Sequence, residues 1–272
     1  MDYKSIPMEQ SGERCGFDAL QGAFDSHCHL EQELEDREEI IAECKKYCMK
    51  GLISVCASPS DFEQAVQLAE KHPNFVHYTA GLHPFEGVKA AEQEIESYVV
   101  KIHDIFSEKN RPKPVAIGEM GLDYTLVKSS DIGRSKRNFL SFIDLANELD
   151  LPIIIHCRGA YSEVIETLKY STKQKVVFHY FNQPEFTEEI LNNGWTISLP
   201  FTLSRSKIKA VFEKATLDNM ILETDSPIRL GDKRITPLNI GELARNISNV
   251  TSISEKEIVE KTSRNVSSIF KI

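Results

Sequence analysis

The sequence predicts an α/β protein in which eight parallel strands close into a barrel. Short apolar runs rich in β-branched residues recur along the chain, and a longer stretch with helical periodicity follows each of them. No Gly-, Pro- or Ser-rich linker divides these repeats. Eight such units favour a closed barrel over an open sheet. We therefore expect a single (β/α)8 TIM barrel over residues 22–272, with an extra C-terminal helix and a polar N-terminal tail over residues 1–21.

Each strand is expected where apolar and β-branched residues interrupt the helical pattern. In order, the strands are GAFDSH (22–27), GLISVCA (51–57), FVHYTAG (75–81), PVAIGE (114–119), PIIIHC (152–157), KVVFHY (175–180), WTISL (195–199) and NMILET (219–224). Helices are expected at 36–49, 61–71, 88–109, 133–149, 160–169, 184–192, 204–214 and 237–248. The extra helix, near 254–269, begins with a capping box, because Glu257 follows Ser254 by three residues.

The composition excludes several classes of protein. The chain has 41% hydrophobic and 27% charged residues, as ordinary globular proteins do. Its net charge of −9 is unlike that of proteins that coat nucleic acid, so nucleic acid would have to bind at a small positive or metal-charged mouth. No apolar run approaches the ~20 residues of a membrane span, and the N-terminus lacks a secretory signal, so a cytoplasmic protein is expected. The six cysteines form no C-x-x-C pair and are expected to be reduced.

Metal-capable side chains stand where the predicted strands end, which is where barrel enzymes carry their reactive groups. They are His27 and His29 (first strand), Glu119 (fourth), His156 (fifth), His179 (sixth) and Asp225 (eighth). Each alone has an ordinary alternative, such as a hydrogen-bonded histidine or a turn aspartate, but six at one mouth indicate a common cause. Six ligands are too many for one tetrahedral site. Two divalent ions (zinc, magnesium or manganese) are therefore expected, with Glu119 bridging them.

These motifs resemble those of the TatD-type metal-dependent hydrolases of the amidohydrolase superfamily. They are FDSHCHL (24–30), GLHP (81–84), GEMGLDY (118–124), PIIIHCR (152–158), FHYF (178–181) and ETDSP (223–227). The resemblance implies a deoxyribonuclease that removes nucleotides from the 3′ end of single-stranded DNA. It places His27, His29 and Asp225 at one metal and His156 and His179 at the other. The chain departs from the usual H-C-F-S-G pattern, because Asn182 and Gln183 replace small residues.

The expected chemistry is hydrolysis by a metal-activated water, with Asp225 as general base and Glu119 as the second catalytic residue. Arg158, two residues beyond His156, is placed to bind a phosphate, with a structural salt bridge as the alternative.

Four further residues are candidates for contact with substrate. His83 either contacts substrate or has a structural role before Pro84, and Asp123 is placed to orient a metal-bound histidine. Tyr124 is a candidate to stack on a base, and Arg229 belongs to a basic run that follows Asp225.

Three functions compete. A metal-dependent nuclease acting on single-stranded nucleic acid is favoured by a mouth that carries Arg158, Arg229 and Arg234. The alternative enzyme is an amidohydrolase-type hydrolase of an ester or amide, such as an aminoacyl-tRNA deacylase. A non-catalytic metal-stabilised module is disfavoured, because the ligand set is complete. No protein partner is indicated.

Overall fold

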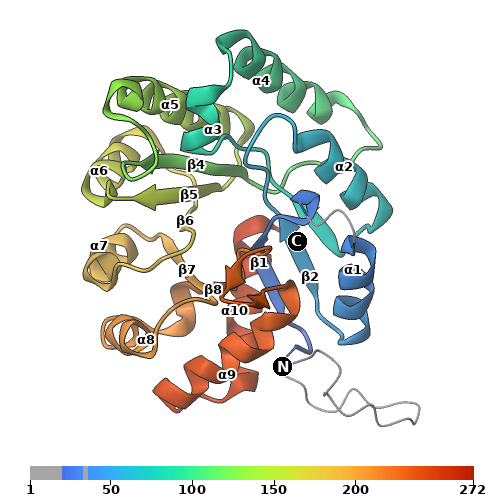
Figure 1. The fold of residues 1–272 in the computed structure, drawn as a ribbon, viewed down its shortest axis with the longest axis vertical. Helices are drawn as coiled ribbons and strands as arrows, with labels where there is room; N and C mark the ends of the chain where they lie inside the picture. The colour runs from blue at the N-terminus through green and yellow to red at the C-terminus, as the bar shows by residue number, and fades with distance from the viewer. Residues whose placement is uncertain (1–19, 33–35) are drawn as a thin grey trace.

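Eight parallel strands pair with one another in the order of the sequence. The computed structural model describes residues 20–32 and 36–272, and Figure 1 shows its strands surrounded by helices. The strands are β1 (Phe24–Cys28), β2 (Gly51–Ser54), β3 (Val76–Tyr78), β4 (Ile117–Asp123), β5 (Ile153–Arg158), β6 (Val176–Phe178), β7 (Thr196–Pro200) and β8 (Met220–Glu223). They form one sheet of β1–β3 and one of β4–β8.

Two seams join these sheets into a closed barrel. At the first seam Ala80 bridges to Ile117, and the N–H of Gly118 donates to the carbonyl of Ala80 at 2.9 Å. At the second, Cys28 bridges to Ser226, and the N–H of His29 donates to the Ser226 carbonyl at 2.6 Å. The predicted TIM barrel is confirmed.

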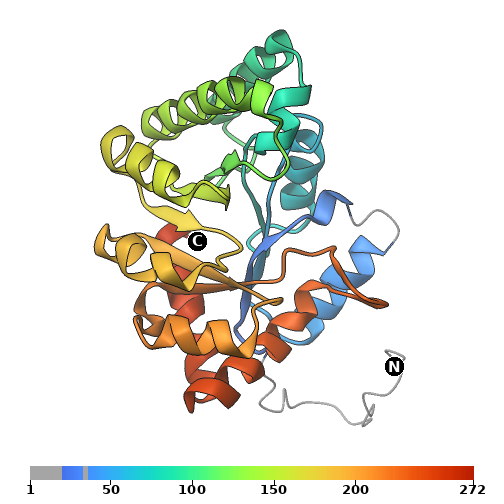
Figure 2. The same ribbon diagram turned by 60° about the vertical axis from the view of Figure 1, so that its left-hand side comes forward.

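Helices cover the outside of the barrel, as Figures 1 and 2 show. They are α1 (Arg37–Lys46), α2 (Phe62–Lys71), α3 (Pro84–Lys89), α4 (Glu92–Ser107), α5 (Ile132–Leu149), α6 (Tyr161–Ser171), α7 (Thr187–Asn192), α8 (Arg205–Phe212), α9 (Ile240–Thr251) and α10 (Glu255–Phe270). The main cluster of buried apolar side chains lies between strands and helices. The predicted cap of the last helix forms, with the Ser254 hydroxyl accepting the N–H of Glu257 at 3.2 Å.

Several elements differ from the sequence prediction, and three of these differences are described next. The helix expected at 88–109 is two helices, because Ala90 and Ala91 adopt extended backbone angles. Strand β4 continues to Asp123 instead of ending at Glu119. The run 229–234 is a hairpin of β9 (Arg229–Leu230) and β10 (Lys233–Arg234).

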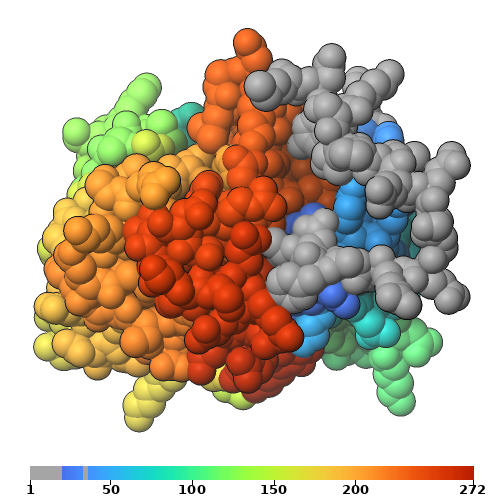
Figure 3. Space-filling view, turned by 90° about the horizontal axis from the view of Figure 1, so that it is seen from below, coloured from blue at the N-terminus to red at the C-terminus, as the bar shows by residue number. Residues whose placement is uncertain are grey.

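Helix α10 fills the end of the barrel opposite the predicted site. Ile154, Val177 and Ile221 lie two residues before His156, His179 and Glu223, so they point into the barrel one layer below these polar residues. This lower layer forms a second apolar cluster with residues of α10, namely Val266, Ile269 and Phe270. Figure 3, turned by 90° from Figure 1, shows orange and red segments near the C-terminus over the middle of the side that faces the viewer.

Replacing Phe270 with alanine is expected to lower the free energy of unfolding by about 3–5 kcal/mol, because it leaves a cavity in this lower cluster. Phe270 is 4% exposed, whereas Tyr170 on α6 is 83% exposed. Tyr170→Ala is therefore a matched control that should stay within about 0.5 kcal/mol of the parent. Urea denaturation measures both. Equal midpoints for the two variants would show that α10 contributes no packing there.

The cysteine expectation holds only in part. Cys28, Cys44, Cys56 and Cys157 are buried thiols outside any disulfide. Cys48 is disulfide-bonded, so the prediction of reduced thiols is wrong for this residue.

Two other expectations concern the N-terminal tail and membrane spans. The predicted tail lies outside the described residues, apart from Leu20 and Gln21, which form a turn. Within the described part of the chain, no helix is both long and apolar enough to cross a membrane.

Candidate metal centre

The six predicted ligands meet at the carboxyl end of the barrel. They are supplied by β1 and the residue after it (His27, His29), by β4 (Glu119), by β5 (His156) and by the segments directly after β6 and β8 (His179, Asp225). Asp225 is the most exposed of the six, with 20% of its side chain exposed. Its backbone has φ 56°, and its N–H donates to the carbonyl of His27 at 2.9 Å. The β1–β8 seam therefore holds Asp225 beside His27.

One group of ligands joins the ends of β1 and β8. Asp225 Oδ1 lies 3.4 Å from His29 Nε2 and 3.7 Å from His27 Nε2. One ligand atom from each of His27, His29 and Asp225 falls within 4.8 Å of the others, which suits a single cation.

Glu119 connects this group with a second one. Its Oε2 lies 3.2 Å from His179 Nε2 and 3.3 Å from His156 Nδ1, while its Oε1 lies 3.7 Å from His29 Nε2. The two oxygens of one carboxylate thus face imidazoles of both groups. This is the arrangement expected of a carboxylate that bridges two ions.

The outer nitrogens of three imidazoles are held by hydrogen bonds. His156 Nε2 pairs with Asp123 Oδ2 at 3.1 Å, and His179 Nδ1 pairs with Glu223 Oε1 at 3.1 Å. His29 Nδ1 donates to the Val55 carbonyl at 2.8 Å. Each bond leaves the inner nitrogen, which faces Glu119 or Asp225, as the acceptor that binds metal.

Buried polar atoms without hydrogen bonds support a cation in this place. Both ring nitrogens of His27 and Oε2 of Glu119 are buried and lack a hydrogen-bond partner among the described residues. Such atoms are costly to bury unpaired. One ligand atom from each of His27, Glu119 and His179 lies within 4.8 Å of the others, and these donor types suit zinc or manganese, so the residues present fit a divalent metal.

The pKa values favour the ligand forms of two groups. Burial, reinforced by the nearby His179, holds the pKa of His27 well below its usual value, so this imidazole is neutral. Burial alone would raise the pKa of Glu119, but the imidazoles of His83, His156 and His179 hold it well below its usual value. Glu119 is therefore ionised.

Below the ligands, Asp25 ties β1 to β8. Its Oδ1 accepts the N–H groups of Thr224 at 3.0 Å and His27 at 3.3 Å, and its Oδ2 accepts the Thr224 hydroxyl. Burial raises the pKa of Asp25 to about 8. Because Thr224 precedes Asp225, this carboxyl fixes the backbone next to two ligands.

The whole barrel matches one family model. Residues 24–271 match the model described as TatD related DNase. The chain belongs to this family. It is 31% identical over 262 residues to human "Deoxyribonuclease TATDN3", covering 92% of this chain and 94% of the human protein. It is also 26% identical to the Erwinia tasmaniensis protein named "3'-5' ssDNA/RNA exonuclease TatD", covering 88% of this chain and 95% of that protein.

A solved TatD structure has the same fold. The TatD homologue YJJV from Escherichia coli K12 superposes with a TM-score of 0.82 at 22% identity, over 93% of this chain and 99% of that one. The resemblance drawn from the motifs is therefore confirmed, and the chain is a TatD-type hydrolase.

The structure places the predicted substrate residues of this TatD barrel at different distances from the ligands. The ring of His83 lies 4.2 Å from that of His156, and its Nδ1 accepts the N–H of Phe85 at 3.2 Å. Burial lowers the pKa of His83 to about 4, so the imidazole is neutral and its Nε2 carries the proton. His83 can thus cap α3 and donate a hydrogen bond at the same time.

The predicted basic residues differ in how closely they are paired, and Arg158 makes a long ion pair of the kind expected of a structural role. Arg158 is exposed over 56% of its side chain, and its guanidinium lies 4.0 Å from Asp123. Arg229 is exposed in the hairpin, without an ion pair to the described site residues. Arg234, in contrast, is paired with Asp36 at 2.8 Å, which ties the hairpin to the start of α1.

Sequence reasoning missed two carboxylates of the TatD site. Glu223 holds His179, and Glu31 lies 3.2 Å from Nδ1 of His29. Glu223 stands in the ETDSP motif and also accepts the N–H of Tyr180 at 2.6 Å. Asp123, expected among the substrate and orienting residues, is fully buried behind His156, a place that favours orientation over substrate contact.

Replacing Glu223 with glutamine is expected to weaken metal binding about 10- to 100-fold, because a charged partner of a ligating imidazole is lost. Isothermal titration with Zn²⁺ or Mn²⁺ measures the change. Glu188→Gln, at an exposed position on α7, is the control and should bind metal like the parent. Equal affinities in both variants would contradict a role for Glu223 in holding His179.

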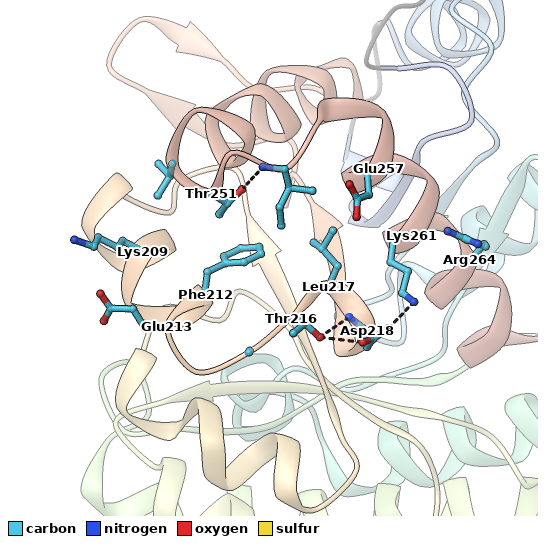
Figure 4. Close-up of a pocket in the computed structure, with 13 residues that line it drawn as sticks. Lys209, Phe212, Glu213, Thr216, Leu217, Asp218, Thr251, Glu257, Lys261 and Arg264 are labelled. Carbon is cyan, nitrogen blue, oxygen red and sulfur yellow. Dashed lines mark hydrogen bonds and ion pairs between the residues drawn. The ribbon is translucent and has the colours of Figure 1, made fainter.

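The protein also has a hollow that lies away from the metal-capable residues. A cavity of about 630 Å³ lies among α8, the segment before β8 and the α9–α10 connection. Figure 4 shows Lys261 paired with Asp218 at its edge. Leu217 and Asp218 precede β8, so this cavity is at the end of the barrel opposite the metal-capable residues.

Proposed function

We propose that this TatD family member is a divalent-metal-dependent deoxyribonuclease that removes nucleotides from the 3′ end of single-stranded DNA. The observation that carries the proposal is the placement of Glu119 between two groups of imidazoles at the barrel mouth. The printed name of the Erwinia relative supports the substrate and direction. Nothing in the comparisons favours the ester or amide alternative. A cytoplasmic location stays a prediction.

The residues at the barrel mouth would have separate roles in phosphodiester hydrolysis. His27, His29 and Asp225 would hold one ion and His156 and His179 the other, with Glu119 shared. When bound, two divalent ions would lower the pKa of a water molecule and place positive charge next to the phosphate oxygens.

Asp225 and Arg158 supply the remaining functions. Asp225 is partly exposed and faces both β1 imidazoles, so it is placed to take the proton of the attacking water. The exposed guanidinium of Arg158 binds a phosphate oxygen of the strand. Bound ions together with Arg158 would make the mouth locally positive in a chain with net charge −9.

A metal-titrated assay tests the proposal. Chelator-stripped protein is given single-stranded DNA labelled at the 3′ end, the same strand labelled at the 5′ end, and a chromogenic ester or amide. We expect release of the 3′-labelled mononucleotide and a stepwise 5′-labelled ladder, both only after Mg²⁺, Mn²⁺ or Zn²⁺ is added. Internal cuts as first products would indicate an endonuclease. Turnover of the ester or amide with intact DNA would replace the nuclease by the alternative hydrolase.

A further inference from the structure

A cavity of about 410 Å³ lies at the end of the barrel that carries the metal-capable residues. The three loops that follow β4, β5 and β6 form it. It is lined by Tyr124, Gly159, Ala160, Tyr161, Ser162, Glu163, Gln183 and Phe186. Its volume is within the ~300–1,000 Å³ typical of small-molecule sites.

The cavity is joined to the metal-capable residues through Arg158. Tyr124 directly follows Asp123, which holds His156, and the N–H of Tyr124 donates to the carbonyl of Arg158 at 2.9 Å. Gly159 directly follows Arg158 and has φ +68°. A Cβ atom at Gly159 would lie 3.6 Å from the Cβ atom of Tyr124. Arg158, whose side chain is exposed, therefore directly precedes a residue of the cavity wall.

Aromatic rings with restricted motion form two sides of the cavity. Phe186 stacks on the buried Tyr161, with ring centroids 4.9 Å apart and an interplanar angle of 16°. The hydroxyl of Tyr124 donates to Glu163, whose other oxygen pairs with Lys136. Rings held in this way offer flat surfaces at a low entropy cost, which suits a planar heterocycle.

Gln183 supplies an unused polar edge. Its side-chain amide has no hydrogen-bond partner within residues 20–32 and 36–272, and it lines the cavity. An amide both donates and accepts, which allows it to pair with the edge of a nucleobase. Gln183 is also one of the two residues at which this chain departs from the small residues of the usual motif.

We propose that this cavity binds a nucleobase of the substrate strand, with the adjoining phosphate at Arg158 and the amide of Gln183 on the edge of the base. The inference rests on the proposed function, because the strand is positioned by the phosphate at the metal-capable cluster. Charge favours a nucleotide over a neutral ligand, since the exposed cation Arg158 is the neighbour in sequence of Gly159 in the cavity wall. Gln183 then determines which base is preferred next to the scissile bond.

Fluorescence of 2-aminopurine tests the cavity independently of catalysis. Single-stranded oligonucleotides carry the probe at the 3′-terminal or the penultimate position, with phosphorothioate linkages that resist hydrolysis, and are mixed with metal-loaded protein. We expect quenching at one of the two positions. Gln183→Ala should raise the Kd about 5- to 100-fold, and Phe186→Leu should reduce the quenching. Gln64→Ala, exposed on α2, is the matched control and should leave both unchanged.

The possible outcomes separate this inference from the proposed function. Binding of the strand, detected by anisotropy, without quenching at either position would overturn the cavity inference and leave the nuclease intact. Equal Kd values for Gln183→Ala and Gln64→Ala would also overturn it. If 2-aminopurine nucleoside monophosphate binds in a Gln183-dependent manner but DNA is not cleaved, the cavity stands and the nuclease proposal fails. Unchanged melting temperatures of the variants exclude unfolding as the cause.

Discussion

Replacing Glu119 with glutamine is expected to lower metal-dependent hydrolysis by about 10³-fold or more, because metal-ion catalysis is worth several kcal/mol. Glutamine keeps the shape of the side chain but removes the charge that faces His156, His179 and His29. Both groups of ligands lose their shared anion. Initial rates on labelled single-stranded DNA and metal content by elemental analysis measure the effect, and the metal content should fall by at least one ion per chain.

Glu188→Gln serves again as the control for Glu119→Gln, because it removes one exposed carboxylate from α7 and should change neither rate nor metal content. A Glu119→Gln protein that keeps its full metal content and its rate would show that this carboxylate does not bridge two ions.

Replacing Asp225 with asparagine is expected to lower kcat about 10²- to 10⁴-fold, the usual contribution of a general base. Much of the metal binding should remain, since an amide oxygen replaces the carboxylate oxygen beside His27 and His29. Asparagine also tolerates the left-handed backbone at this position, where φ is 56°. Single-turnover rates and a metal titration separate the two effects.

Asp104→Asn on the exposed face of α4 is the matched control for Asp225→Asn. If Asp225→Asn retains full turnover at saturating metal, another group must accept the proton. If it loses metal and activity together, Asp225 acts chiefly as a ligand.

The sequence predicted the parts of the fold that depend on local pattern. All eight strands lie where apolar, β-branched runs were recognised, and the strand ends carry the six polar residues to one mouth. The break at Ala90 and Ala91 was missed, because alanine is a good helix former and gives no local stop signal. The hairpin carried a signal that was not used: Gly231–Asp232 between two short runs is typical of a two-residue turn.

The missed residues of the site depend on contacts between distant parts of the chain. Glu223, at the end of β8, pairs with His179, which follows β6. The two residues are 44 positions apart in the sequence, and no spacing rule predicts such a pair. Arg234 was expected at the mouth because of its charge. Its guanidinium is instead paired with Asp36, which is 198 residues away in the sequence. Residue type predicted which groups could bind metal, while only the folded chain shows which carboxylates position them.

With helix α10 in place, the two ends of the barrel differ in chemistry, and this difference matters for the evolution and engineering of the protein. Inside the barrel, apolar side chains pack at the end that α10 fills, while buried polar atoms without hydrogen bonds, among them those of His27 and Glu119, lie at the other end. Substitutions at well-separated sites usually add in free energy. A new substrate preference acquired at the mouth at a cost in stability can therefore be offset by better packing around Phe270 without altering the chemistry.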